Sequence, residues 1–453
     1  METSQKKLHF ISYSNLNKWD AKFYLTNETI FNPKYKQVLF GNFLSKASIE
    51  KVKIEDGKKY KILGVRSYGK GVYLNRESLG KDLKMKEYYK AKPNHLFWCK
   101  VDTKNGAFGV VNNKLSDGFG SSNMTFAEID TDKINVDFLQ LLFTSKKIHS
   151  YLDSFVTGTT NRKYIRPDQL LEEIHIPLPT LQEQQEIVEA YFSKINEANQ
   201  LELEANNIDQ EIEQYLFTEL GISTGNKIEK KKGLNFVEFS QLERWGVEYN
   251  LNSSNSLLSS KKFPNKRLKD IVLINPTTTL PKVPNLQISF IPMEVVSDDY
   301  GIVTELRNKT VSESKGYTKF MEGDLIWARI TPCMQNGKSA IVKNLENGLG
   351  VGSTEFHIIR TENANINLDY IYHFLRLDIV LKDAMSHFTG SAGQQRVPKS
   401  YLEELLIPIP EYHKQTEISN HLYQLKDQKI KLFKKVEQLK HQANEEFEKA
   451  IFQ

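Results

Sequence analysis

Two kinds of hydrophobic pattern alternate along the chain. The first consists of short runs of Val, Ile, Phe and Tyr broken by Gly, Asn, Asp and Pro, which is typical of strands joined by turns. Segments 60–72 and 324–330 are examples of such strands. Segments 138–151 and 370–385 instead carry apolar residues at helical spacing. Strands and helices mixed in this way predict a compact α+β globule.

The second pattern is a long polar stretch with a narrow apolar stripe, and it occurs twice, from residue 181 and from residue 412. The apolar positions advance by threes and fours or sums of them, which indicates a coiled-coil helix. They are Val188, Tyr191, Ile195, Ile208 and Ile212 in the first stretch and Ile418, Leu422, Leu425, Val436 and Leu439 in the second. A helix of this size, roughly 40 residues, would be about 60 Å long.

Each of these helices has one apolar stripe, so the simplest partner for each is the other. Antiparallel pairing would place the two globules at opposite ends of the paired helices. The alternative is that each helix is an ordinary amphipathic helix that packs on its own domain. Repetition, equal length and placement after each globule favour the paired arrangement.

The chain also contains an internal sequence repeat. The tetrapeptide Ile-Pro-Leu-Pro at 176–179 recurs as Ile-Pro-Ile-Pro at 407–410, and Leu-Glu-Glu-Ile at 171–174 recurs as Leu-Glu-Glu-Leu at 402–405. Further pairs follow in the same order, including 134–138 with 366–370. An ordered series of this kind predicts two homologous halves. We expect globular domains at 1–179 and 234–410, long helices at 180–222 and 411–453, and a linker at 223–233.

Composition narrows the class of protein. With 453 residues, 26% of them charged, the chain has the length of two or more folded domains. No apolar run reaches the roughly 18 residues that cross a bilayer, and no signal-peptide pattern is present, so we expect a cytoplasmic protein. Two cysteines cannot form a cysteine-rich zinc site, and we expect no metal.

No catalytic constellation is found, so we expect a chain that is not an enzyme. There is no phosphate-binding Gly-x-x-x-x-Gly-Lys-Ser/Thr loop. The glycines at 118–120 and 348–352 occupy equivalent places in the two halves, and a repeated turn explains them better than a dinucleotide site. The segment Asn-Pro-Thr-Thr at 275–278 begins like the motif of amino-methyltransferases but lacks its second proline and its aromatic residue, which favours a turn.

A twofold arrangement of similar globules suits the reading of two separated sites on one extended partner, and duplex DNA is the commonest such partner. The net charge of +5 permits this partner without requiring it. Clustered basic residues neutralise phosphates and bond base edges. The candidates for DNA contact are Arg66, Tyr68, Lys70, Lys81, Lys84, Arg307, Lys309, Lys315, Lys319, Arg329 and Lys338.

Taken together, these motifs resemble the specificity subunit of type I restriction-modification systems. The resemblance rests on the Ile-Pro-Leu-Pro segment with Leu-Gln-Glu-Gln-Gln-Glu-Ile at 181–187, its counterpart in the second half, Gly-Asp-Leu-Ile at 323–326 and Gly-Ser-Thr-Glu-Phe at 352–356. It covers essentially the whole chain. The second half keeps Gln415 and Ile418 but loses much of the Glu-Gln run, so docking at that place is expected to differ.

The resemblance implies a non-catalytic role in defence against foreign DNA. Each globule would be a target recognition domain that reads half of a bipartite DNA sequence, and the paired helices would fix the gap. They would also dock two modification subunits, which methylate adenine with S-adenosylmethionine, and restriction subunits that use ATP and Mg would join them. This chain itself would bind no cofactor. Because the halves have diverged, at Asn123 and Glu355 for example, an asymmetric target is expected.

Two rival interpretations remain open at this point. One is a stand-alone DNA-modifying enzyme with an unrecognised site, which activity of the purified chain alone would favour. The other is a coiled-coil scaffold that never binds nucleic acid, which failure to bind any duplex would favour.

Overall fold

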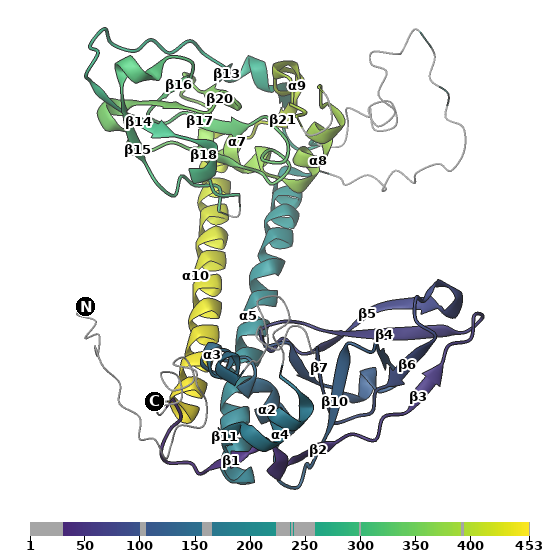
Figure 1. The fold of residues 1–453 in the computed structure, drawn as a ribbon. Helices are drawn as coiled ribbons and strands as arrows, with labels where there is room; N and C mark the ends of the chain where they lie inside the picture. The colour runs from purple at the N-terminus through teal and green to yellow at the C-terminus, as the bar shows by residue number, and fades with distance from the viewer. Residues whose placement is uncertain are drawn as a thin grey trace. The chain divides into compact units, whose positions relative to one another are not determined.

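The computed structural model describes residues 30–99, 106–155, 165–222, 236, 239, 259–298, 300–390 and 394–452. The chain divides into two compact units (Figure 1). The first unit comprises residues 1–200 and 435–453, and the second comprises residues 201–434. The predicted linker at 223–233 lies outside the described residues.

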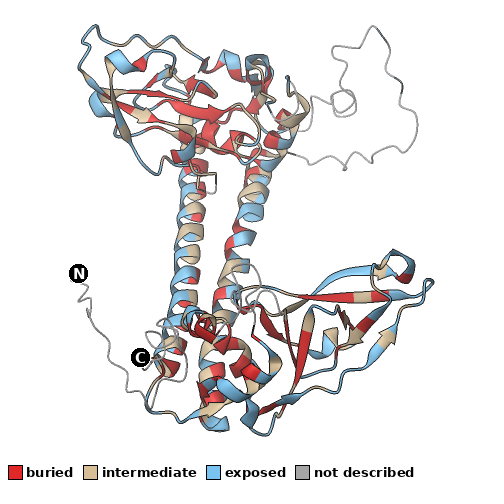
Figure 2. Cartoon of the chain, in the orientation of Figure 1, coloured by how far each residue is buried: buried red, intermediate tan, exposed pale blue. Residues whose placement is uncertain are grey.

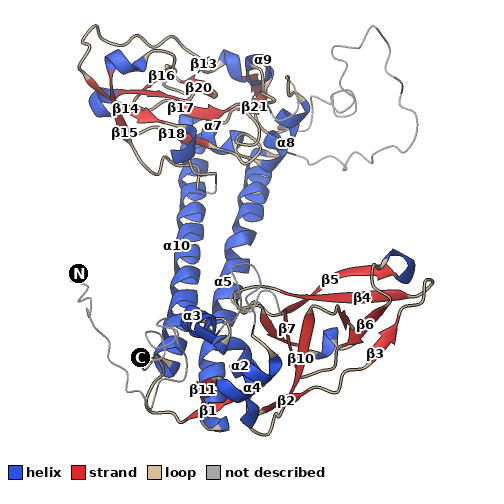
Figure 3. Cartoon of the chain, in the orientation of Figure 1, coloured by secondary structure: helices blue, strands red, loops and turns tan. Residues whose placement is uncertain are grey.

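The first unit combines two sheets with helices (Figure 3). Its strands are β1 (Gln37–Leu39), β2 (Leu44–Lys46), β3 (Lys51–Lys53), β4 (Lys59–Val65), β5 (Val72–Leu79), β6 (Glu87–Lys90), β7 (His95–Cys99), β8 (Phe108–Val110), β9 (Phe119–Gly120), β10 (Met124–Ile129) and β11 (His175–Pro177). Its short helices are α2 (Val136–Leu142), α3 (Lys146–Phe155) and α4 (Pro167–Glu173). The sheets have the orders β2-β10-β7-β8 and β3-β6-β9-β4-β5, and β1 pairs with β11.

The second unit is built in the same way. Its strands are β12 (Asn265–Arg267), β13 (Leu273–Ile274), β14 (Gln287–Ile291), β15 (Arg307–Thr310), β16 (Thr318–Met321), β17 (Leu325–Ala328), β18 (Ser339–Ile341), β19 (Leu349–Gly352), β20 (Phe356–Arg360) and β21 (Leu406–Pro408). Its short helices are α7 (Leu368–Leu375), α8 (Asp378–Ser386) and α9 (Lys399–Glu404). The sheets have the orders β13-β20-β17-β18 and β15-β14-β19-β16, and β12 pairs with β21.

The two units share one topology, strand for strand. Strand β4 pairs with β5 in antiparallel and with β9 in parallel, and β14 makes the same two pairings with β15 and β19. Strand β6 pairs antiparallel with β9, and β16 pairs in the same way with β19. Within the described residues, the first unit adds β3 at the edge. The predicted α+β class and internal repeat are confirmed.

Three of the predicted elements are divided in the structure. The prediction of one strand over 60–72 is wrong, because β4 ends at Val65 and β5 begins at Val72 after a tight turn. In that turn Tyr68, Gly69 and Gly71 have positive φ, which no continuous strand contains. The helical spacing over 138–151 is likewise shared between α2 and α3, and that over 370–385 between α7 and α8.

The repeated glycines belong to strands rather than to simple turns. Gly120 lies in β9, and Gly350 and Gly352 lie in β19. Each of these strands lies between two other strands of its sheet. A Cβ on Gly350 would lie 2.1 Å from the ring of Phe320, and one on Gly120 would lie 2.8 Å from the ring of Phe97. Glycine is therefore needed where a buried aromatic ring covers the strand.

Two helices of 40 residues, α5 (Leu181–Leu220) and α10 (Tyr412–Ile451), contribute to both units. In the first unit, Lys194 of α5 forms an ion pair with Glu446 of α10 at 2.7 Å, and Glu197 pairs with Lys435 at 2.8 Å. In the second unit, Asp209 pairs with Lys429 at 2.7 Å. Partner numbers fall along α10 as they rise along α5, so the predicted antiparallel pairing of the helices is confirmed.

The residues of the apolar stripes of α5 and α10 are buried or half-buried, and buried positions recur along both helices (Figure 2). The predicted seam residues that are buried are Val188, Ile208, Ile418, Leu422, Leu425, Val436 and Leu439, and the half-buried ones are Tyr191, Ile195 and Ile212. Several also belong to the domain cores: Val188 packs in the core of the first unit and Ile418 in that of the second. The helices thus both pair with each other and anchor in the globules.

A buried glutamine attaches each long helix to its globule. The amide nitrogen of Gln184 donates to the Pro179 carbonyl at 2.8 Å, and its oxygen accepts from the Asn135 backbone N–H at 2.7 Å. Gln415 makes the same two bonds, to the Pro410 carbonyl and from the Asn367 backbone N–H. Both glutamine side chains are fully buried. The repeated proline and glutamine motif is therefore a structural joint between globule and helix.

In the part of the chain that the structure describes, no helix is long and apolar enough to cross a membrane.

Candidate nucleic-acid interface

The first unit concentrates basic residues on the sheet that contains the hairpin β4–β5. Residues 51–90 include twelve lysines and arginines against five acidic residues. Some of these cations are balanced, since Lys61 pairs with Asp117 at 2.7 Å and Lys59 pairs with Glu77. Others are exposed, and for them the described residues include no ion-pair partner; among them are the candidates Arg66, Lys70, Lys81 and Lys84. A surface with this excess of cations attracts phosphates.

The turn between β4 and β5, which carries the candidates Arg66, Tyr68 and Lys70, packs against α2 through its backbone. The side-chain amide of Gln140 donates to the Gly69 carbonyl at 2.6 Å, and a Cβ on Gly69 would lie 2.0 Å from the Phe143 carbonyl oxygen. Glycine is therefore obligatory where the turn packs against the end of α2. The Tyr68 side chain, 58% exposed, projects from this turn, and the Arg66 guanidinium lies 4.9 Å from the centre of the Tyr73 ring.

The corresponding sheet of the second unit is not basic. Residues 287–321 include four basic residues and five acidic ones. Arg307 is held by Glu294 at 2.6 Å and by Glu305 at 3.3 Å, and Lys309 lies over the ring of Phe290 at 4.8 Å. Lys315 and Lys319 are exposed. The candidates of the first unit lie at the two ends of the β4–β5 hairpin, with Arg66, Tyr68 and Lys70 in its turn and Lys81 and Lys84 beyond the end of β5. Those of the second unit are dispersed or neutralised.

A second group of polar residues lies on two adjoining loops of the second unit, which we call the paired loops (residues 329–338 and 394–397). The backbone N–H of Val397 donates to the Arg329 carbonyl at 2.8 Å, and that of Thr331 donates to the Gln395 carbonyl at 3.0 Å. Arg329 and Lys338 begin and end the first of these loops. Exposed amides of Asn336 and Gln394 lie on the same two loops. Arginine and amide side chains are the groups that bond base edges.

Glu355 fixes an arginine on the paired loops. The guanidinium of Arg396 donates to both carboxylate oxygens of Glu355 at 2.8 Å, and Arg329 lies 3.8 Å from the same carboxylate. The Arg396 guanidinium, more than Arg329, lowers the pKa of the Glu355 carboxyl below its usual value. Sequence reasoning missed Arg396. The signal was available, because Arg396 follows the Thr-Gly at 389–390, which matches Thr-Gly at 157–158 in the first half, but no partner could be assigned without Glu355. The matching loops of the first unit, at 100–105 and 156–164, lie outside the described residues.

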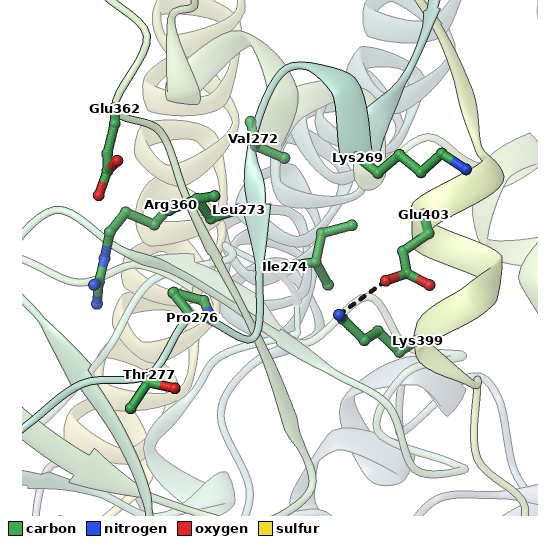
Figure 4. Close-up of a pocket in the computed structure, with 10 residues that line it drawn as sticks. All are labelled: Lys269, Val272, Leu273, Ile274, Pro276, Thr277, Arg360, Glu362, Lys399 and Glu403. Carbon is green, nitrogen blue, oxygen red and sulfur yellow. Dashed lines mark ion pairs between the residues drawn. The ribbon is translucent and has the colours of Figure 1, made fainter.

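The Asn-Pro-Thr-Thr segment forms a turn beside a surface cavity of about 470 Å³ (Figure 4). Asn275 has a φ of 54°, and its side-chain oxygen accepts from the Ile358 backbone N–H at 2.9 Å. Arg360 donates to both oxygens of the buried Asp324, and Lys399 pairs with Glu403 at 2.8 Å. The polar side chains beside this cavity bond to other groups of the protein, so they have a structural role.

No group of three or more His, Cys, Asp or Glu residues suited to a metal ion occurs among the residues that the structure describes. Cys99 and Cys333 are free thiols.

A sequence model of the type I restriction modification DNA specificity domain matches residues 39–214 and 260–441. The specificity subunit of the type I restriction enzyme EcoEI from Escherichia coli is 40% identical over 152 residues, which are 33% of this chain and 25% of that protein. The EcoAI specificity subunit of the same organism is 42% identical over 133 residues, 29% of this chain and 23% of that protein. The matched region spans about a quarter of the length of these curated relatives.

A solved structure has the same fold. Its description is "Structural basis underlying complex assembly and conformational transition of the type I R-M system", and its chain aligns with a TM-score of 0.55 at 14% identity, over 93% of this chain and 98% of that one. The family model describes a DNA specificity domain and not a methyltransferase or nuclease domain. Because that model matches most of the chain in two copies, the chain belongs to the family of type I restriction-modification DNA specificity proteins.

Proposed function

We propose that the chain is the non-catalytic DNA-specificity subunit of a type I restriction-modification complex and that it reads an asymmetric, bipartite DNA sequence. The observation that carries the proposal is the pair of units with one topology and different polar surfaces. One fold used twice supplies two readers, and different surfaces make the two half-sites differ. The paired helices would then set the gap between the half-sites.

Each unit would read DNA with a different part of the same fold. In the first unit the cationic sheet with Arg66, Tyr68 and Lys70 would bind the phosphate backbone, with Lys81 and Lys84 adding charge. In the second unit the paired loops would approach base edges with Arg329 and Arg396. Lys338 would support them, whereas Arg307 is already neutralised by two glutamates and would contribute less.

Helix α5 suits a protein partner better than DNA. Helix α5 carries ten acidic residues and a single lysine, so it would repel phosphates. We therefore assign to the helices the docking of two modification subunits, with restriction subunits joining the complex. S-adenosylmethionine, ATP and Mg would be bound by those partners and not by this chain.

Mapping of methylated adenines in the host genome, with the gene intact and deleted, tests the proposal. Loss of one bipartite, asymmetric methylated motif on deletion is the expected result. If the complex assembles with its modification subunits and methylates DNA, yet the motif is symmetric or unaffected by this chain, the proposal is wrong.

A further inference from the structure

The second unit contains a cavity of about 460 Å³ between the long helices and its globule. Its walls come from α5, α7, α8, α10 and the turn at residues 335–337. All of these residues belong to the second unit. This volume is typical of sites for small molecules, and the walls combine apolar side chains such as Ile212 and Leu381 with polar ones.

Two basic side chains in this cavity have unused hydrogen-bonding capacity. His373 lines the cavity, is 2% exposed, and has no hydrogen-bond partner for either ring nitrogen within the described residues. The Lys426 ammonium donates to the Tyr372 hydroxyl at 3.1 Å and lies 4.4 Å from the centre of that ring. An ammonium has three N–H groups, so this bond satisfies one of them. Buried donors without acceptors are costly.

Positive charge accumulates around the same point. Arg376 stands beside both groups, and its guanidinium donates to the backbone carbonyls of Gly337 and Asp298. Burial, together with Lys426 and Arg376, lowers the pKa of His373 well below its usual value. Burial and Arg376 also lower the pKa of Lys426, which Asp209 offsets in part. The Lys426 residue as a whole is half-buried.

Three of the four acidic side chains that line the cavity have partners of their own. Asp209 pairs with Lys429 at 2.7 Å, and Asp378 pairs with Lys382. Glu213 accepts from the Ile379 backbone N–H, and burial raises its pKa, which favours the neutral form. Asp298 meets Arg376 through its carbonyl oxygen. Asp209 is thus a charged neighbour of Lys426, but within the described residues no acidic side chain forms an ion pair or hydrogen bond with His373 or Lys426.

The fold does not require these charges, because the first unit lacks them. At the offsets of the repeat, the counterparts of His373 and Arg376 are Leu141 and Thr144, and the counterparts of Lys426 and Lys429 are Ile195 and Ala198. The same helices are thus packed there by apolar and small side chains. The cationic cluster occurs in the second unit and not in the first, and a ligand of the second unit explains this difference best.

We propose that this cavity binds a small molecule through an oxyanion, a phosphate or a carboxylate, which accepts hydrogen bonds from His373 and Lys426. The ligand would supply the missing negative charge and the missing acceptors together. Binding would favour the protonated forms of both groups, so it would take up protons from solution near neutral pH. This site is separate from the sheet and loops assigned to DNA.

Titration calorimetry of the purified full chain tests the inference, with inorganic phosphate in one arm and acetate in the other. Each titration is run in two buffers of different ionisation enthalpy, so that proton uptake appears as a buffer-dependent heat. Lys426→Ile and His373→Leu install the residues of the first unit and should fold. Lys434→Ile, an exposed lysine on the same helix, is the control.

We expect saturable binding of at least one anion with proton uptake, at least tenfold weaker in Lys426→Ile and in His373→Leu and unchanged in Lys434→Ile. The stronger arm identifies the class of oxyanion. Absence of saturable binding in both arms, or equal binding by folded Lys426→Ile and His373→Leu, would overturn the inference. No DNA is present, so either outcome leaves the proposed function unaffected.

Discussion

The two units have the same strand order, but one carries a basic sheet and the other a nearly balanced one. The segment that forms β3 to β6 carries twelve basic and five acidic residues, whereas the segment from β14 to β16 carries four and five. The joints Gln184 and Gln415, in contrast, are preserved bond for bond. The buried bonds of the joints are the same in both units, whereas the charge on the exposed sheet differs. The comparison therefore locates candidate function where the two copies differ.

The largest expected effect concerns acid sensitivity of the second unit. His357 is fully buried, and its ring nitrogens contact the Val397 carbonyl at 2.9 Å and the Asn275 amide at 3.0 Å. Burial lowers its pKa to about 4, so the unfolded chain takes up a proton first as the pH falls. Stability from neutral His357 is complete above pH 6.5 and is lost as the pH falls towards 4, by about 3 kcal/mol.

Hydrogen exchange of peptides from the second unit, between pH 7 and pH 4, measures this loss. His357→Gln keeps a donor and an acceptor but does not titrate, so its stability should converge with that of the wild type as the pH falls. The first unit has Thr125 at the equivalent position, so it has no counterpart of His357. Burial lowers the pKa of His95 and of His149 in the first unit, which gives that unit an acid sensitivity of its own that His357→Gln should leave unchanged. Identical pH profiles for wild type and variant would contradict the assignment.

Next in size is the contribution of the cationic sheet to DNA affinity. Removal of Lys70, Lys81 and Lys84 together by Ala should weaken binding about 100-fold at 0.15 M salt and reduce the salt slope by about 2.7, since each phosphate contact contributes about 0.9. The matched triple variant of Lys309, Lys315 and Lys319 should lose less than tenfold. Fluorescence anisotropy across a salt series measures both. Equal losses would show that the difference in charge is irrelevant to binding.

The joints should behave alike in both units. Gln184→Ala or Gln415→Ala leaves a buried N–H and a buried carbonyl without partners, which we expect to lower the free energy of unfolding by about 2 kcal/mol in either case. Gln182→Ala, at an exposed position on the same turn of α5, is the control. Urea denaturation provides the measurement, and a loss confined to one unit would mean that the joints are not equivalent.

The smallest expected effect is that of a single arginine on the paired loops. Arg396→Ala removes one bidentate group and should weaken binding of a specific duplex about tenfold, with little change in the salt slope. Arg267→Ala, which removes another surface arginine that contacts Glu404, should leave affinity unchanged. A fall in salt slope with equal loss on all sequences would instead make Arg396 a phosphate contact.

Local patterns were sufficient to predict the repeat, the two long helices and the class of fold, because spacing by threes and fours and matched offsets lie in the sequence itself. The break at 66–71 and the division of the shorter helices depend on tertiary packing, such as the contact of Gly69 with the end of α2. The pairings of Glu355 with Arg396 and of Arg307 with Glu294 cross loops whose register no periodicity reveals. The ion-pair partners of the candidates in the second unit could therefore not be predicted from the sequence.

The central claim is that each unit reads its own half of one DNA site. The most direct test is selection of bound duplexes from a random library by the wild-type complex and by the Arg329→Ala, Arg396→Ala double variant. The account predicts a bipartite motif for the wild type, of which the double variant blurs one half and keeps the other. Blurring of both halves to the same extent, or a motif without two parts, would contradict it.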